Sequence, residues 1–183
     1  MQLQGEGEVK VSKGRLSDGK KGNLETINLM IKAARACAAD PYIRMYAIGI
    51  LNQYKTDSQN YIDEALAIGD YVKKHVRYVR DPDGIELLTD PKTMIDMLNR
   101  GIARGDCDDM SLLIATLLLS IGHSPFYRAV RYDDSYGHFN HIYVVCYEKN
   151  LGKPRTRIAL DAIIKQKPIG FEVPHKSGQE FAV

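Results

Sequence analysis

The apolar residues change their spacing at Gly122, and this change constrains the fold more than any other feature of the chain. Before Gly122 they recur every three or four residues, which is typical of helices with one buried face. After Gly122 the period changes to two, which is typical of β-strands. Helices that precede the strands favour the α+β class with an antiparallel sheet, because a parallel sheet needs long crossovers between its strands.

The same spacing, together with residues that end helices, sets the expected elements. Asn23 can cap the first helix, and Pro41 ends it because its ring restricts Asp40 to non-helical conformations. Helices are predicted over residues 23–39, 41–52, 58–76, 91–100 and 106–121, and strands over residues 126–132, 141–148 and 156–161. A turn is predicted at residues 81–84, and a hairpin loop at residues 150–154.

The length of the chain and its first residues predict one domain that follows a tail. A chain of 183 residues fits one compact domain and is short for two. Residues 1–22 are rich in Gly and Lys and show no sustained period, so we expect a flexible tail there, with an edge strand near Val9–Val11 as an alternative. The single domain is expected over residues 23–183.

The composition argues against several classes of partner and site. The 25 basic and 23 acidic residues give a net charge of +2, too small a bias for nucleic acid or an anionic membrane as the main partner. Three cysteines without a CxxC spacing argue against a disulfide framework and a cysteine-rich zinc site. No apolar run approaches the ~20 residues of a membrane span, and the opening segment lacks the apolar stretch of a secretory signal. We therefore expect a cytoplasmic protein.

The segment Gly105-Asp106-Cys107-Asp108-Asp109 places a cysteine in the first turn of a helix that is apolar nearly all round. Such a helix is buried, so its N-terminus is held rigidly. The free N–H groups and the dipole at that end favour the thiolate, which is the nucleophilic form of cysteine. We therefore expect a nucleophilic Cys107 with a lowered thiol pKa, which carboxylates close to the sulfur would oppose. The alternative is that Cys107 is a small buried hydrophobic residue.

Two histidines, His138 and His141, lie at the start of the strand predicted at residues 141–148. A histidine that begins a core strand can project over the end of the sheet, where the N-terminus of a helix can face it. If this strand and residues 156–161 form a hairpin, Asp161 returns to the same end as His141. The pattern matches a nucleophile, a base and an orienting carboxylate, although a lone histidine is more often structural.

These segments resemble the transglutaminase-like superfamily of papain-type cysteine enzymes, and above all its compact bacterial and tailed-phage members. The resemblance covers about residues 60–174 and rests on Gly105-Asp106-Cys107-Asp108-Asp109, His141-Ile142-Tyr143-Val144 and Ala159-Leu160-Asp161, in that order. It implies a helical lobe at the N-terminal side. It also implies a central helix that begins at the cysteine and packs on an antiparallel sheet.

The resemblance implies a role for each matching residue. Cys107 is implied as the nucleophile, His141 as the general base and acid, and Asp161 as the residue that orients His141. His138, Tyr143 and Asp106 are assigned to the substrate groove, and Tyr143 stands where the family often has tryptophan. We expect no metal and no cofactor, and the expected partner is a protein or peptide substrate. For a phage-encoded chain, a location in the virion is the alternative to the cytoplasm.

The resulting hypothesis is a hydrolase or acyltransferase that acts on peptide or isopeptide bonds through a thioester at Cys107. Hydrolysis is favoured over crosslinking, because water needs no second substrate site and an amine acceptor does. One alternative is a degenerate family member that serves as a structural or partner-binding module, for example in a phage particle. Another is a metal hydrolase that uses His138, His141 and carboxylates from residues 106–109, which the His-x-x-His spacing disfavours because it suits a helix.

Overall fold

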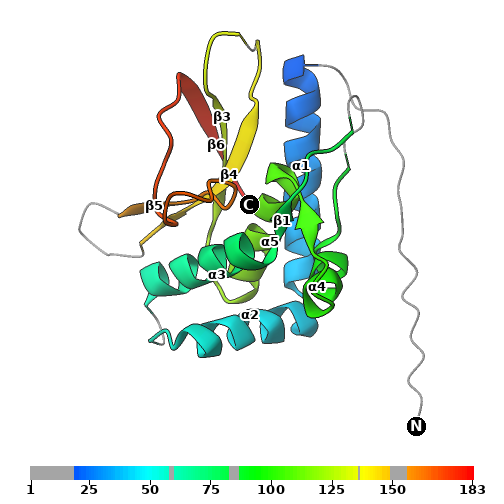
Figure 1. Ribbon diagram of the computed structural model, residues 1–183, viewed down its shortest axis with the longest axis vertical. Coiled ribbons are helices and arrows are strands. Elements are labelled where there is room, and N and C mark those ends of the chain that lie inside the picture. The colour runs from blue at the N-terminus through cyan, green and yellow to red at the C-terminus, as the bar shows by residue number, and fades with distance from the viewer. Residues whose placement is uncertain (1–18, 58–59, 83–86, 136, 149–155) are drawn as a thin grey trace.

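The computed structural model describes residues 19–57, 60–82, 87–135, 137–148 and 156–183. The expected tail up to residue 18, the end of the turn at 81–84 and the hairpin loop at 150–154 lie outside these residues. Within them the chain is a mixture of helix and sheet that is compatible with an α+β fold, with helices on one side and a sheet on the other (Figure 1).

The described residues form five helices whose bounds follow the predicted ones closely. These are α1 (Gly19–Ala38), α2 (Pro41–Tyr54), α3 (Tyr61–His75), α4 (Pro91–Asn99) and α5 (Cys107–Ser120). Asp40 and Asp90 each precede a proline and cap α2 and α4, because their side chains accept hydrogen bonds from backbone N–H groups of the first turn. The first helix begins at Gly19, ahead of the predicted Asn23, so it includes four residues of the expected tail.

The strands form two sheets of unequal size. The larger sheet has the order β5-β4-β3-β6, with all neighbours antiparallel, and contains β3 (Phe126–Arg131), β4 (His141–Tyr147), β5 (Arg157–Leu160) and β6 (Ser177–Ala182). The smaller sheet pairs β1 (Arg77–Tyr78) with β2 (Arg104–Gly105) in parallel. Three strands of the larger sheet were predicted, and β4 and β5 are the expected hairpin neighbours. The short β1 and β2 and the edge strand β6 were not predicted.

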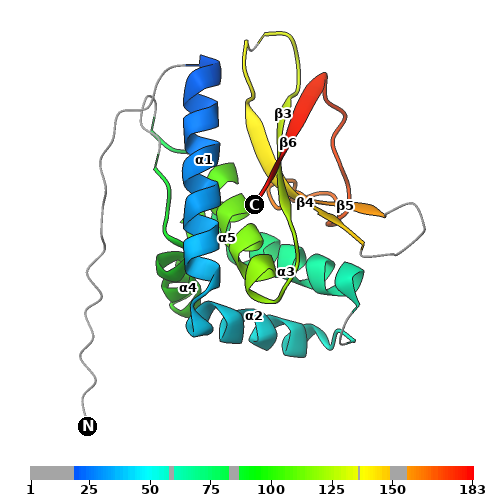
Figure 2. The ribbon, with the colours of Figure 1, turned by 180° about the vertical axis from the view of Figure 1, so that it is seen from behind.

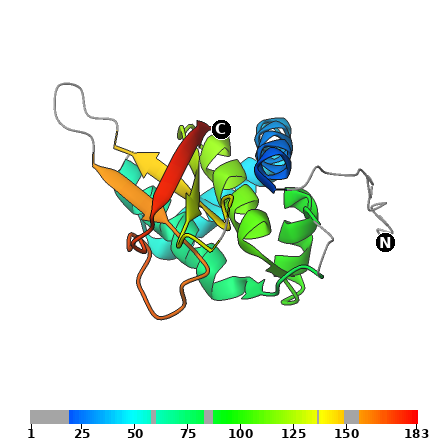
Figure 3. The ribbon, with the colours of Figure 1, turned by 90° about the horizontal axis from the view of Figure 1, so that it is seen from above.

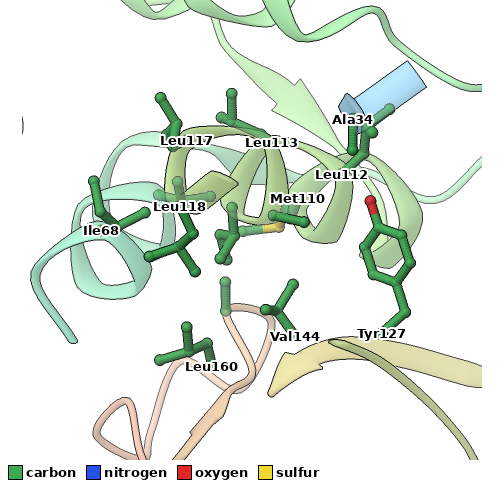
Figure 4. Packing of buried hydrophobic residues seen from close by; sticks show 14 of the residues in the cluster. Ala34, Ile68, Met110, Leu112, Leu113, Leu117, Leu118, Tyr127, Val144 and Leu160 are labelled. Carbon is green, nitrogen blue, oxygen red and sulfur yellow. The ribbon is translucent and has the colours of Figure 1, made fainter. Parts of the chain in front are cut away.

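Helix α5 is the centre of the packing. It contacts α1, α2, α3 and α4 on one side and β3 and β4 on the other, as the views from the front, from behind and from above agree (Figures 1, 2 and 3). Its leucines meet Ile68 of α3 and the sheet residues Val144 and Leu160 (Figure 4). Each fully buried leucine or valine contributes about 1.5–3 kcal/mol through the hydrophobic effect. The start of α5, where Cys107 lies, is therefore fixed by the best-packed helix of the protein.

The two faces of β4 have different surroundings because successive side chains of a strand point to opposite faces. Ile142, Val144 and Cys146 belong to the core between the sheet and the helices. Tyr143 and Val145 belong to a smaller apolar cluster on the outer face of the sheet. His141, at the start of β4, is buried at 4% exposure.

Candidate active site

The first turn of α5 is held by reciprocal hydrogen bonds between side chains and backbone. The Asp106 carboxylate accepts from the backbone N–H groups of Asp108 at 3.0 Å and Asp109 at 3.4 Å. The Asp109 carboxylate accepts in return from the backbone N–H of Asp106 at 3.3 Å. This capping box satisfies donors that the helix cannot pair internally. Cys107 therefore lies in a turn that has little freedom to move.

Asp109 also joins this turn to the segment before α4. It is 3% exposed, and its second carboxylate oxygen accepts from the backbone N–H of Thr89 at 2.7 Å. Burial raises the pKa of Asp109, which the hydrogen bonds from Thr89 and Asp106 partly offset. Gly105 makes this close approach possible, because a Cβ at that residue would lie only 2.6 Å from Cβ of Asp109. The carboxylates of Asp106 and Asp109 thus have a structural role at the helix start.

The sulfur of Cys107 is in an anionic environment that favours the thiol. The residue is half-buried, and its thiol donates to Asp108, with 3.2 Å between Sγ and Oδ1. Burial first, and then the charges of Asp108 and Asp106, hold the pKa of Cys107 well above its ordinary value. The predicted lowering of the thiol pKa is therefore not found, because burial and the charges of Asp108 and Asp106 raise this pKa instead.

Asp106 itself is perturbed by its neighbours. Burial raises the pKa of Asp106 to about 6, and the charges of Asp109 and Asp81 act in the same direction. The hydrogen bonds that Asp106 accepts as the helix cap act against this rise. Asp106 therefore changes its charge near pH 6, and it directly precedes Cys107 in the chain.

His141 and Asp161 form a buried pair at the same end of the sheet. The distance from His141 Nε2 to Asp161 Oδ2 is 2.8 Å, and the two residues are 4% and 3% exposed. A carboxylate only accepts hydrogen bonds, so this contact places the ring proton at Nε2 and leaves the lone pair at Nδ1. The predicted neighbourhood of His141 and Asp161 is present in the structure, and it results from the antiparallel pairing of β4 with β5.

The segment after Asp161 is fixed to the end of α3. Asp161 Oδ1 accepts from the backbone N–H of Ile163 at 3.2 Å. Lys73 donates through Nζ to the carbonyl of Ile164 at 2.5 Å, and Lys165 donates to the carbonyl of Val76 at 3.3 Å. Lys73 of α3 thus binds the segment, and Lys165 of the segment binds the end of α3. These contacts restrict the position of the Asp161 carboxylate, which binds His141.

Cys107 and His141 line one pocket. Its other lining residues come from the start of α1, the turn at Cys107 and the approach to β4: Asn23, Thr26, Ile27, Asp106, Asp108, Ala129, Phe139, Asn140 and Ile142. Ser111, one turn after Cys107, donates from Oγ to the carbonyl of Ile142 at 3.2 Å. This buried hydrogen bond ties the helix that carries the cysteine to the strand that begins with the histidine.

The predicted groove residues have different places. Asp106 lines the pocket, whereas His138 and Tyr143 are not among its lining residues. The Tyr143 ring instead lies beside His141, with 5.5 Å between ring centroids, and its hydroxyl donates to Glu172. The contact of Tyr143 with substrate stays a prediction. His138 is half-buried in the segment before β4.

Two tyrosines near the cysteine were not predicted. The Tyr132 ring stacks on His141, with 5.4 Å between centroids. Tyr78 of β1 pairs with Gly105, and its pKa is raised by burial and by the nearby Cys107 and Asp106. An aromatic residue at the end of a strand has no sequence signal that separates packing from a site. Only the register of β1 against β2 brings Tyr78 near the cysteine.

A cluster with metal-ligand chemistry exists at the cysteine. The ligand atoms of Asp106, Cys107 and Asp108 lie within 4.8 Å of one another. Among the described residues, neither His138 nor His141 belongs to this or another such group. The ligand set of the alternative metal hydrolase is therefore not brought together. Acidic groups at a helix start are explained by the cap that they form.

Comparisons with known proteins give one distant structural neighbour to report. No protein-family model and no curated protein matches the chain. Among solved structures, a protein from Parabacteroides distasonis described as a "putative protease" matches with 14% identity and a TM-score of 0.48. The match covers 80% of this chain and 30% of that one, so the chain spans under a third of its neighbour's length.

In the described part of the chain, no helix is long and apolar enough to cross a membrane.

Proposed function

We propose that the protein is a cysteine hydrolase or acyltransferase of the transglutaminase-like, papain-type class, which acts on peptide or isopeptide bonds. One observation carries the proposal. Cys107 begins a rigidly packed helix and lines one pocket with His141, whose Nε2 is held by Asp161 at 2.8 Å. In this proposal Cys107 is the nucleophile, His141 the base and acid, and Asp161 the orienting carboxylate.

The first half of the reaction forms a thioester. His141 Nδ1 takes the proton from the thiol as Sγ attacks the carbonyl carbon of the amide. The carbonyl oxygen becomes an oxyanion, for which the backbone N–H of Cys107 at the helix start is the expected donor. The C–N bond then breaks, and the proton on His141 passes to the leaving amine. Asp161 stabilises the transient imidazolium from the Nε2 side.

The second half of the reaction releases the acyl group. Water gives a proton to His141 and attacks the thioester, the C–S bond breaks, and the thiol of Cys107 is restored with that proton. An amine in place of water gives an acyl transfer. We favour hydrolysis, because water needs no second binding site.

The raised pKa of Cys107 decides which form of the pair exists before substrate binds. Burial and the charges of Asp108 and Asp106 favour the thiol form of Cys107, so in this proposal the reaction begins from a thiol rather than from a thiolate. The proton then moves to His141 only as the sulfur attacks. Under this proposal the reactivity of Cys107 depends strongly on His141, which makes the proposal testable without a known substrate.

The second candidate is a non-catalytic binding module of the same fold. One observation favours it, namely that the Cys107 thiol is bound to Asp108 and its pKa is raised rather than lowered. In this case the three residues have packing roles only. Cys107 would then react no faster with an electrophile than its burial and its pKa dictate, and His141 would have no influence on that rate.

The deciding experiment measures alkylation of each cysteine by iodoacetamide at pH 7, followed by peptide mass spectrometry. We expect His141→Gln to slow the alkylation of Cys107 roughly tenfold or more, in line with the contribution of a positioned base. Glutamine at residue 141 keeps an N–H donor for Asp161, and His138→Gln is the matched control that should leave the rate unchanged. Equal rates for Cys107 in the unaltered protein and in His141→Gln would favour the binding module.

A further inference from the structure

We propose that Tyr132 and Tyr143 are positioning residues that hold the His141 imidazole in the plane in which Nδ1 serves Cys107. Glu172 and Arg157 fix Tyr143 in that arrangement. The inference rests on the proposed function for its catalytic consequence. Its structural content, a ring held by two other rings, is independent of catalysis.

The hydrogen bond to Asp161 does not by itself fix the orientation of the His141 ring. The Asp161 hydrogen bond fixes one ring atom, Nε2, but the ring can still rotate about the axis through that bond. The Tyr132 ring lies at 5.4 Å with an interplanar angle of 21°, and the Tyr143 ring at 5.5 Å with an angle of 31°. Two rings this close to parallel restrict that rotation, because a turned imidazole would collide with them.

The position of Tyr132 is fixed by its backbone. Its N–H donates to Asn140 Oδ1 at 3.2 Å, and the backbone N–H of Asn140 donates to the carbonyl of Val130 at 3.0 Å. These two hydrogen bonds join the end of β3 to the residue that immediately precedes His141. The same two hydrogen bonds therefore hold Tyr132 and the backbone next to His141.

The position of Tyr143 is fixed through its hydroxyl. The hydroxyl donates to Glu172, and Arg157 binds both carboxylate oxygens of Glu172 at 2.6 and 2.9 Å. Arg157 Nε also donates to Glu180 of β6 at 3.1 Å, so the network spans the outer face of the sheet. A bidentate contact between arginine and a carboxylate is stronger and more directional than a single hydrogen bond. Tyr143 is 3% exposed, so its ring has no room to move away.

Flat aromatic faces also suit the charge that forms on His141 during the reaction. A cation within about 6 Å of a tyrosine ring centroid is attracted by the ring quadrupole. Both tyrosines satisfy this distance. The same two rings thus orient the neutral imidazole and favour the imidazolium that the thiol proton creates.

The catalytic test uses Cys107 alkylation in a double-mutant cycle. We expect Tyr132→Leu to slow the reaction roughly tenfold, since small misplacements of a catalytic group have such effects, and Tyr132→Phe to restore most of the rate. In the His141→Gln background Tyr132→Leu should have no further effect. An equal loss in both backgrounds would show that Tyr132 acts on the fold rather than through His141.

Tyr143 is tested with the same readout. Tyr143→Phe and Glu172→Gln each weaken one link of the network while they keep the ring, so both should lower the rate by a similar factor, smaller than that of Tyr132→Leu. Tyr46→Phe is the control, because the Tyr46 hydroxyl is hydrogen-bonded to the Tyr71 hydroxyl at 2.8 Å, between α2 and α3 and outside this network. A loss for Tyr46→Phe as large as for Tyr143→Phe would overturn the assignment.

A second readout separates this inference from the proposed function. In Cys107→Ala protein, the ring signals of His141 in an NMR spectrum should be sharp and shifted by the neighbouring rings. Tyr132→Leu should remove most of that shift and broaden the signals. If the shift and line width stay unchanged, the tyrosines do not hold the ring, whatever the chemistry at Cys107. If they change but His141→Gln has no effect on alkylation, the positioning stands and the proposed function fails.

Discussion

The Cys107 thiol donates a hydrogen bond to its neighbour Asp108, with 3.2 Å between Sγ and Oδ1. A helix N-terminus ordinarily favours a thiolate, and here burial and the charges of Asp108 and Asp106 act in the opposite direction. The sulfur therefore stays protonated until a base removes its proton. Asp106 contributes to both effects, because its charge raises the pKa of Cys107 and its carboxylate caps the helix.

The first prediction is that Asp108→Asn lowers the pKa of Cys107. Asparagine removes the charge beside the sulfur but keeps the shape of the side chain. Alkylation of Cys107 at pH 8 should become several-fold faster, roughly three- to tenfold, because removal of one close charge shifts a pKa by a fraction of a unit to a full unit. Asp90→Asn is the matched control, since Asp90 accepts from Cys37 at 3.5 Å and should change only that cysteine. An unchanged Cys107 rate would contradict the role given to Asp108.

The second prediction concerns the pH dependence of stability through Asp106. Its pKa in the folded protein is about 6, above the ordinary 3.8 of an aspartate. At pH 5 the folded chain therefore binds a proton that the unfolded chain lacks, so this contribution to stability is present at low pH and is lost as the pH rises through about 6. Asparagine caps a helix as well as aspartate does.

Urea unfolding of the unaltered protein and of Asp106→Asn at pH 5 and pH 7 measures this contribution. The free energy of unfolding of the unaltered protein should fall more between pH 5 and pH 7 than that of the variant. Other titrating groups cancel in this comparison. Parallel changes in the two proteins would mean that Asp106 titrates as an ordinary carboxyl.

The order and pairing of the main strands could be predicted because they depend on local periodicity. A run of apolar and β-branched residues marks β4, where Ile142 and Val144 belong to the core beside the helices, and a short connection to β5 dictates a hairpin. The edge strand β6 could not be predicted in this way. Its sequence is mostly exposed, and it is held by backbone hydrogen bonds to β3, which leave no apolar pattern. Strands β1 and β2 have two residues each, too few for any period.

The contacts of the candidate site also fall into two groups, those that follow from the strand pairing and those that do not. That Asp161 returns to His141 follows from the hairpin, so sequence and topology suffice. That Asp108 turns toward the sulfur depends on a side-chain rotamer, and local sequence does not decide it. That Tyr143 bonds to Glu172 depends on the path of the chain after Asp161. Such contacts depend on the three-dimensional fold, so the pattern of residues along the sequence does not predict them.

The third prediction is that Cys107→Ala leaves the fold intact and abolishes hydrolysis or acyl transfer. A half-buried residue in a capped first turn should contribute little to stability, at most about 1 kcal/mol. Thermal unfolding followed by circular dichroism measures this. Cys37 and Cys146, whose pKa values are raised to about 11 and about 12, should react slowly in the native protein. Loss of the folded state in Cys107→Ala would show that the cysteine is present for packing.

The fourth prediction is that Gly105→Ala destabilises the helix start. The added Cβ would lie 2.6 Å from Cβ and 2.5 Å from Oδ2 of Asp109, so the capping carboxylate must move. We expect a loss of about 2 kcal/mol in the free energy of unfolding, as is typical of overpacking at a tight contact. Gly49→Ala in α2, where nothing lies within 4 Å, is the control and should stabilise the helix slightly. Equal effects of the two substitutions would argue against the tight contact.

The last prediction separates the two histidines and defines the part of Asp161. The Cys107 thiol donates to Asp108, and we expect Sγ also to lie within about 4 Å of a ring nitrogen of His141, since catalytic contacts are often long before substrate binds. His141→Gln should therefore slow the alkylation of Cys107, whereas His138→Gln should not. Asp161→Asn should keep the cysteine reactive, because asparagine can still accept from Nε2, but it should lower turnover, because a neutral amide stabilises the imidazolium less than a carboxylate does.

Each result has a distinct reading, and a crystal structure of the protein supplies the distance itself. A slower Cys107 in His138→Gln, with no change in His141→Gln, would transfer the role of base to His138. Asp161→Asn that unfolds the protein would show a structural carboxylate, since loss of one partner from a buried pair costs about 3–5 kcal/mol. Asp161→Asn that folds and retains full turnover would remove the orienting role. Only a folded, slow Asp161→Asn beside a slow His141→Gln matches the arrangement proposed for the three residues.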